Sequence, residues 1–454
     1  LSIWPYVGVS SMNEVVSVHM FGGSCLRDSS DLDRIAEVIG GWEGQSIVVV
    51  SALWGTTDRL MRASKEPRYA SRLVNDLSEQ HLRFAPGLLS SELGPLFTKV
   101  LNGIEQSLTE LARQPINGVA VNRLLAAGER LSALVVAHRL KKYGIVAHPV
   151  GSEDIGLRLD GINRAPTVDL ASSMGLLDRK ALHDTPVITG WFGEGKDGQL
   201  ALLSRGGSDH TATSIARLVD ASRVLLWKDV QGVLPLNPRW GIQTEPIAYL
   251  GYGEAMELSR LDTPILHPAT VEPLTDTGIP LEIRSLHGSM DKNAATVIGP
   301  DLYEENVIKA IGCLPSVVSI QCLTKSLEQQ SGRLGDVLVD FSKAEIACWH
   351  LDAQPGEIRW IVSQHDADEA RELIEKQFAS TQSEAFSAIV SLVGNRVGTH
   401  RNTLHSDEAE RLGIEILSDT GHAVRMLTKT HDMVDLLHQL SQKCGLKDTL
   451  QSRD

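Results

Sequence analysis

Three apolar runs, each bounded by turn-forming residues, stand out in the hydrophobic pattern of the first 300 positions. They cover residues 15–21 (VVSVHMF), 46–53 (SIVVVSAL) and 223–230 (RVLLWKDV). Continuous apolar runs of this length suit strands that are buried on both faces of a parallel sheet. We therefore predict that these segments are strands of one parallel sheet.

Between these runs, apolar residues recur at the spacing of amphipathic helices. Residues 28–42 begin with three capping residues and place aliphatic side chains on one face. Residues 122–144 carry leucines at the same spacing and end in basic residues followed by Gly144, a common helix stop. Alternating strands and helices predict a layered α/β domain, to which we assign residues 15–300.

The pattern changes after residue 300, where a β-α-β-β-α order occurs about twice with a period of roughly 70 residues. We assign the two units to residues 305–380 and 381–454, with an interleaved arrangement of the two as the alternative. Neither unit contains a catalytic cluster of its own. The repeat is therefore predicted to be regulatory or to join subunits.

Composition and charge narrow the class of protein. The chain has 454 residues, of which 42% are hydrophobic and 22% charged, and its net charge of −14 argues against nucleic-acid and anionic-membrane partners. No window reaches the roughly 18 uninterrupted apolar residues of a membrane span. The start lacks the basic region of a signal peptide, with Met12 as an alternative first residue. Five scattered cysteines favour the reducing cytoplasm.

Two glycine pairs carry the candidate phosphate chemistry. Gly22 and Gly23 follow the first predicted strand, and Gly206 and Gly207 lie between a short apolar stretch and a predicted helix. Glycine lets a backbone approach a phosphate closely, and a helix start offers free N–H groups. Each loop alone is equally an ordinary strand-to-helix turn, with Asp209 as a helix cap in the second. Together they suit a nucleotide that faces a second anionic substrate.

Charged residues near these loops are further candidates. Arg205 is placed to bind a carboxylate or phosphate through its guanidinium, and Asp209 to position a base or hold Mg²⁺. Glu129 interrupts a helix otherwise built for burial, although a helical glutamate is usually solvated. Residues 227–239 are equally a strand exit with ordinary turn residues. His267 has no second histidine or cysteine at metal spacing, so we predict no metal-binding side chains.

Together, several segments resemble the aspartate kinases, and most of all the kinase half of the bifunctional aspartokinase/homoserine dehydrogenases. These segments are FGGS, VVVSAL…TTD, GERLSA, ITGWFG, LLSRGGSDHTA, LLWKDVQGV…NPR, EAMELSRLDTPILHPAT and the terminal repeat. Their order and spacing match from about residue 18 to the C-terminus. The resemblance implies the amino-acid kinase fold, a three-layer α/β/α sandwich, followed by a pair of ACT-like units with the ferredoxin-like β-α-β-β-α-β order.

The resemblance also implies a function. The expected reaction is the ATP-dependent phosphorylation of the L-aspartate side chain to 4-phospho-L-aspartate, the first step towards lysine, threonine and methionine, with Mg²⁺ bound through the ATP phosphates. A homodimer and an amino-acid effector on the ACT pair are expected as well. The alternatives are a non-catalytic, amino-acid-binding regulatory paralogue, and a kinase of another amino-acid carboxylate.

By the same resemblance, particular positions acquire roles. Arg205 would clamp the substrate α-carboxylate and Glu129 would pair with its ammonium group, and both count with Asp209 as catalytic. The aspartate-binding positions are Ser51, Thr57, Glu129 and Arg205. The nucleotide-binding positions are Gly22, Gly23, Ser24, Gly206, Gly207, Trp227, Lys228, Asp229 and Arg239. Because a carboxylate is already a nucleophile, catalysis needs mainly positioning and charge neutralisation.

The chain departs from the family pattern at its first glycine loop. Family members usually read K-F-G-G-[ST]-[ST], whereas Met20 holds the lysine position here and Cys25 the second hydroxyl position. Losing such a charge in a dry site costs about 3–4 kcal/mol, or 10²–10³-fold in rate. His19 is a poor substitute because neighbouring strand residues point to opposite faces. We hypothesise that Lys228, an unexpected cation in WKDV, supplies part of the lost charge; the alternative is a solvated lysine.

Overall fold

The computed structural model describes most of the chain. The described residues are 15–67, 70–160, 166–204, 206–261, 266–288, 296–302, 307–324, 327–378, 380–395 and 413–446. One predicted site residue, Arg205, lies outside these ranges. None of the helices within these ranges is long and apolar enough to cross a membrane.

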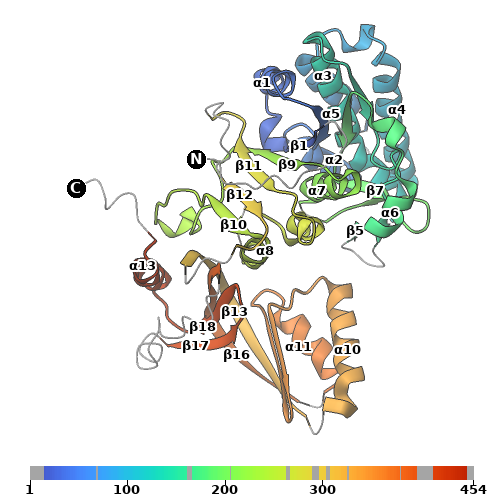
Figure 1. The fold of residues 1–454 in the computed structure, drawn as a ribbon. Coiled ribbons are helices and arrows are strands. Elements are labelled where there is room, and N and C mark those ends of the chain that lie inside the picture. Colours follow the sequence, from blue (N-terminus) through green and yellow to red (C-terminus); the bar gives the residue numbers. More distant parts are fainter. Residues whose placement is uncertain are drawn as a thin grey trace.

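A mostly parallel sheet forms the centre of the N-terminal part (Figure 1). Within the described residues its order is β10-β12-β11-β9-β1-β2-β6-β3, and only the β11–β12 pair is antiparallel. The strands are β1 (Val16–Phe21), β2 (Gln45–Val50), β3 (Ala147–Val150), β6 (Thr185–Thr189), β9 (Arg223–Lys228), β10 (Tyr249–Gly251), β11 (Leu281–Ser285) and β12 (Thr296–Gly299). The three predicted apolar runs are confirmed as the adjacent strands β9, β1 and β2.

Helices cover both faces of this sheet, so the three-layer sandwich is confirmed (Figure 1). One face packs against α1 (Ser29–Gly40), α2 (Thr56–Lys65), α3 (Ala70–Phe84), α4 (Gly94–Arg113) and α5 (Gly118–Lys142). The other face packs against α7 (Gly207–Val219), α8 (Tyr252–Ser259) and α9 (Pro268–Val271). Side chains of β1 alternate between these layers: Val18 and Met20 join the α7 layer, and Phe21 joins the α5 layer.

Short elements lie at the edge of the sandwich. The small antiparallel pairs are β4 (Leu159–Asp160) with β5 (Thr167–Val168) and β7 (Phe192–Glu194) with β8 (Leu200–Leu202). Helix α6 (Leu170–Leu176) follows β5, and its N-cap Asp169 accepts a hydrogen bond from the Ser172 N–H. The β7–β8 hairpin leads directly into the second glycine loop and so helps to position it.

The C-terminal part is an antiparallel sheet with the order β14-β15-β13-β16-β18-β17 (Figure 1). Its strands are β13 (Val307–Leu323), β14 (His350–Gln354), β15 (Glu357–Ser363), β16 (Thr381–Asn395), β17 (Ile414–Asp419) and β18 (Ala423–Thr428). The described helices that accompany it are α10 (Leu327–Ala344), α11 (Ala367–Glu375) and α13 (Met433–Lys443). This arrangement is of the ACT type that the resemblance implies.

The long strand β13 runs through two hydrophobic cores and pairs with β16 along its length. The second half of β13 packs with β15, α10 and α11, where Trp360 and Phe341 are buried. The first half of β13 belongs with β18 and α13, where Met426 and Leu437 are buried. The two cores thus share β13, while the bounds 305–380 and 381–454 and the interleaved alternative remain predictions.

Helix α8 joins the sandwich to the C-terminal sheet. Lys309 of β13 donates to Glu254 at 2.9 Å, and Arg425 of β18 donates from its Nε atom to Glu257 at 3.2 Å. Glu254 also accepts the N–H of Gly251, which closes the capping box of α8. Because buried charges need partners, these two pairs tie the orientation of α8 to the C-terminal sheet.

Candidate active site

A cavity of about 430 Å³ lies where the carboxyl ends of β1, β2 and β9 meet the start of α7. Both glycine loops contribute to its wall, so Gly22 and Gly206, 184 residues apart in sequence, line the same cavity. Its lining residues are Met20, Gly22, Gly23, Ser24, Ser51, Ala52, Leu53, Trp54, Gly55, Thr57, Asp58, Glu129, Trp191, Gly206, Gly207, Ser208, Asp209 and Lys228. A crevice at the carboxyl ends of parallel strands is the usual ligand position in open α/β sheets.

The first glycine loop follows β1 directly. Gly22 is extended (φ −72°, ψ 166°), and the chain then enters the short 3₁₀ turn Gly23–Cys25. A Cβ atom on Gly23 would lie 3.3 Å from the carbonyl oxygen of Ala52, so this loop approaches the segment after β2 closely. Ser51 begins that segment and donates its N–H to the Phe21 carbonyl at 3.1 Å. The two loops therefore form one continuous wall of backbone.

The second glycine loop sets the start of α7. Gly206 is the N-cap with φ +78° and ψ 9°, a left-handed conformation that favours glycine, and no side chain caps the helix. The Gly207 N–H donates to the Ser204 carbonyl at 3.0 Å, whereas the N–H groups of Ser208 and Asp209 have no partner among the described residues. These two groups are at the cavity wall, where the helix dipole is positive. Asp209 is not the cap that an ordinary turn would use, because both its oxygens accept hydrogen bonds from Lys228.

Glu129 is a buried acid at the α5 side of the cavity, with only 2% of its surface exposed. Its Oε1 atom accepts the N–H of Ala52 at 3.2 Å, and its Oε2 atom has no partner among the described residues. Burial raises the pKa of Glu129 to about 8, and the Ala52 hydrogen bond opposes this rise. A carboxyl group held this way is prepared to receive a cation.

Three predicted nucleotide residues lie outside the cavity lining. Trp227 is buried in the core on the α5 face, where its Nε1 atom donates to His19 at 3.3 Å. Asp229 is partly exposed and pairs with Arg27 at 2.8 Å. Arg239 stacks over the ring of Trp240 near β13. Their assignment to the nucleotide remains a prediction.

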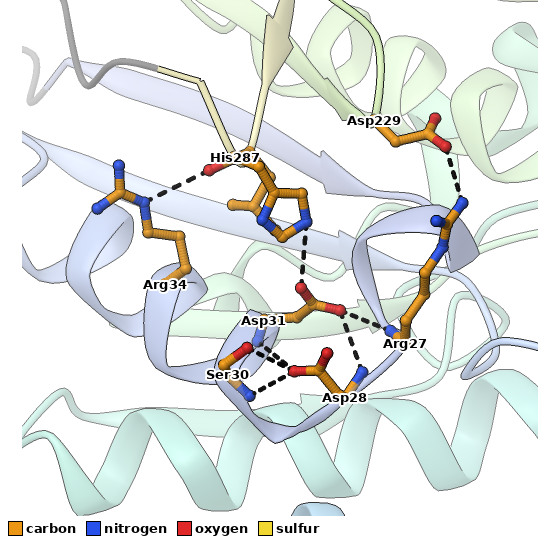
Figure 2. Close-up of polar contacts among 8 residues, drawn as sticks. Arg27, Asp28, Ser30, Asp31, Arg34, Asp229 and His287 are labelled. Carbon is orange, nitrogen blue, oxygen red and sulfur yellow. Dashed lines mark hydrogen bonds and ion pairs between the residues drawn. The ribbon is translucent and has the colours of Figure 1, made fainter.

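The Asp229–Arg27 pair belongs to a polar network that anchors the start of α1 beside the first glycine loop (Figure 2). Asp28 caps the helix, and the buried Asp31 completes the capping box. Asp31 also accepts from the backbone N–H of Arg27 at 2.6 Å and lies 3.2 Å from the Nε2 atom of His287. The loop after β11 is thereby fastened to α1, which stabilises the side of the cavity formed by the first glycine loop.

The structure adds site residues that sequence reasoning missed, among them Trp54, Asp58, Trp191 and Ser208. Trp54 is 57% exposed, and the Arg27 guanidinium lies 4.5 Å from its ring centroid. Trp191 has a left-handed backbone (φ 73°), which is costly for a tryptophan and common at functional sites. Trp54 was detectable as an aromatic residue between Ser51 and Thr57, but no local signal reveals the backbone of Trp191.

Within the described ranges, no group of three or more His, Cys, Asp or Glu side chains is placed to hold an ion. The absence of metal-binding side chains stays a prediction. His267 instead acts as the N-cap of α9, because its Nδ1 atom accepts the N–H of Ala269 at 3.3 Å.

The chain belongs to the amino acid kinase family, whose model matches residues 16–285. It is 25% identical to aspartokinase 3, chloroplastic, of Arabidopsis thaliana over 93% of this chain and 78% of that protein. It is 30% identical to bifunctional aspartokinase/homoserine dehydrogenase 2 of Escherichia coli K12, over 59% of this chain and 34% of the relative. The expected kinship with aspartokinases, monofunctional and bifunctional, is therefore confirmed.

Solved structures establish the fold. The crystal structure of E. coli aspartokinase III in complex with aspartate and ADP matches with a TM-score of 0.77 at 20% identity, covering 94% of this chain and 99% of that one. The aspartate kinase of Clostridium acetobutylicum matches with a TM-score of 0.71, also at 20% identity, covering 95% of this chain and 99% of that one. Both parts of the expected fold, the kinase sandwich and the ACT-type sheet, are thus present in one known architecture.

Proposed function

We propose that this protein is an aspartate kinase, which transfers the γ-phosphoryl group of Mg·ATP to the side-chain carboxylate of L-aspartate. The observation that carries the proposal is the buried Glu129, which faces the same cavity as both glycine loops and has one oxygen without a described partner. A buried carboxylate is stable only with a cation beside it, and the α-ammonium group of an amino acid supplies one. The aspartokinase relatives support aspartate as that amino acid.

The chemistry suits the residues of the cavity. An aspartate oxygen forms the new bond to the γ-phosphorus, while the bond to the bridging oxygen breaks and ADP leaves with that electron pair. No general base is needed, because the attacking carboxylate is already ionised. The N–H groups at the start of α7 and around Gly22 and Gly23 would receive phosphate oxygens, and Ser51 and Thr57 would face the aspartate.

Other parts of the proposal rest on family resemblance. Mg²⁺ would arrive on the ATP phosphates and supply positive charge there. Arg205 would hold the aspartate α-carboxylate. Asp229 and Arg239 would contact a nucleotide that extends beyond the cavity, while Trp227 would support the strand end from the core. The ACT pair would bind an amino-acid effector, and the protein would act as a homodimer in the cytoplasm.

Hydroxylamine trapping tests the proposal. Purified protein, Mg·ATP, hydroxylamine and a panel of acidic amino acids are incubated, and the hydroxamate formed from any acyl phosphate is measured as its coloured ferric complex. We expect aspartyl hydroxamate in preference to glutamyl hydroxamate, with Glu129→Gln raising the KM for aspartate at least tenfold. Turnover of a different carboxylate would reassign the acceptor, and binding without any turnover would leave only a regulatory role.

A further inference from the structure

We propose that Lys228, at the end of β9, is the cation that neutralises the transferred phosphoryl group, in place of a lysine at the position of Met20 on β1. This inference rests on the proposed kinase function. It assigns a catalytic role to one residue of this chain at a point where the family motif is broken.

Strand register puts the two side chains on one face of the sheet. β1 and β9 are parallel neighbours in which Phe21 pairs with Trp227, and both of these side chains enter the α5 layer. Met20 and Lys228, one residue to either side of that pair, must therefore point to the opposite face, towards α7. The structure bears this out, since Met20 packs in the α7 layer and Lys228 reaches Asp209 on the first turn of α7.

Met20 supplies no positive charge to the cavity, because its side chain is apolar and buried. The Met20 side chain is 2% exposed, and its terminal methyl group would lie 3.8 Å from a Cβ atom on Gly22. An apolar group therefore fills the space beneath the first glycine loop. The positive charge has to enter the cavity from elsewhere, and the adjacent strand offers the shortest displacement on the same face.

Lys228 is held rather than solvated. Its Nζ atom lies 2.8 Å from both Oδ1 and Oδ2 of Asp209, and the two side chains are 17% and 9% exposed. An ammonium group has three N–H donors, so one remains for a phosphate oxygen after Asp209 has taken two. Asp209 is thus a positioning residue, because it holds the Lys228 ammonium group beside the start of α7.

Lys228 supplies the positive side-chain charge among the described residues that line the cavity. Among the described lining residues it is the one lysine or arginine, whereas Asp58, Glu129 and Asp209 contribute carboxyl groups. A triphosphate entering this environment requires a cation close to the group being transferred. The reaction makes and breaks only bonds from oxygen to phosphorus, so it requires no proton transfer from Lys228.

Moving the charge back tests the inference. We expect Lys228→Met to lower kcat by about 10²–10³-fold with a smaller change in the KM for aspartate. Adding Met20→Lys to that variant should restore at least tenfold of the lost rate, because the charge returns to the same face from β1. Lys196→Met, which removes an exposed lysine paired with Asp160, is the matched control and should stay within twofold of the wild type.

Nucleotide binding separates failure of this inference from failure of the kinase function. We expect Lys228→Met to lose most of the preference for Mg·ATP over Mg·ADP in equilibrium titrations, whether or not aspartate is turned over. If the wild type shows no turnover but its preference for Mg·ATP over Mg·ADP depends on Lys228, the kinase function is overturned and the role of Lys228 is not. A Lys228→Met variant with kcat within threefold of the wild type and an unchanged preference would overturn the role of Lys228.

The role of Lys228 can be tested even if the Lys228→Met variant does not fold. Lys228→Met leaves a buried carboxylate unpaired, and Asp209→Asn removes that liability. If the single variant does not fold, the double variant Lys228→Met/Asp209→Asn is compared with Asp209→Asn alone. We expect the double variant to be at least thirtyfold slower, and equal rates would refute the proposal.

Discussion

Aspartate binding should release a proton from Glu129. Burial raises the pKa of this carboxyl group to about 8, so at pH 7 about 0.9 of the unliganded sites carry the proton. The ammonium group of bound aspartate favours the ionised carboxylate and lowers this pKa. Binding at pH 7 should therefore release close to one proton per site, and at pH 8.5 only about a quarter of a proton.

Isothermal titration calorimetry measures this release directly. Titrations of aspartate are run at one pH in two buffers with different ionisation enthalpies, such as Pipes and Tris, and the difference in observed enthalpy gives the number of protons. Glu129→Gln is the control variant, since it keeps the shape of the side chain and cannot ionise. Release below 0.2 proton at pH 7, or equal release from the variant, would refute the role given to Glu129.

The raised pKa of Glu129 also predicts how the stability of the folded protein depends on pH. Because the folded protein holds this proton more tightly than the unfolded chain, the stabilisation is complete below pH 4.5 and is lost as pH rises through about 8. The full difference corresponds to about 5 kcal/mol for this fully buried group. Thermal unfolding without ligand should therefore show a smaller fall in Tm between pH 6 and pH 9 for Glu129→Gln than for the wild type; equal falls would contradict the argument.

Two further predictions concern the framework of the site. Gly206→Ala forces an alanine into a left-handed backbone with its Cβ atom 3.0 Å from the side chain of His267. Gly198 has a similar positive φ but nothing within 4 Å of such a Cβ atom, so Gly198→Ala is the control. In urea unfolding, Gly206→Ala should be more destabilising than Gly198→Ala by about 1 kcal/mol or more, and equal losses would argue against the contact. Lys309→Met leaves Glu254 buried without its partner and should cost about 3–5 kcal/mol in the same assay, whereas Arg371→Ala in an exposed pair should cost under about 1 kcal/mol.

The elements of the site were predictable where the signal is local. The apolar runs of β1, β2 and β9 and the glycine pairs after β1 and before α7 are patterns of a few adjacent residues. Burial of Glu129 was not predictable from such a pattern, because a helical glutamate is usually solvated. It follows from the packing of α5 beneath the loop that carries Ala52, a contact between segments 77 residues apart.

The same limit applies to the residues that sequence reasoning placed at the nucleotide. Trp227 and Lys228 are neighbours in sequence and were given the same role, yet alternation along β9 sends one into the core and the other into the cavity. A strand predicted from composition has no assigned faces until its neighbours and register are known. The two residues could therefore be separated only once β9 was known to pair with β1.

Register also decides how a broken motif should be interpreted. Met20 pairs with Leu226, and Lys228 lies two residues further along β9 on the same face of the sheet, so the two backbone positions are roughly 8 Å apart along the diagonal. A lysine has a flexible four-carbon stem, so ammonium groups that start from these two positions can still reach the same ligand atom. The glycine-loop motif covers β1 only. A comparison with that motif therefore shows that the lysine is missing at Met20, but it does not show that a lysine is present at Lys228 on β9. Whether catalysis survives then depends on where the ammonium group ends, and here Asp209 directs it to the cavity.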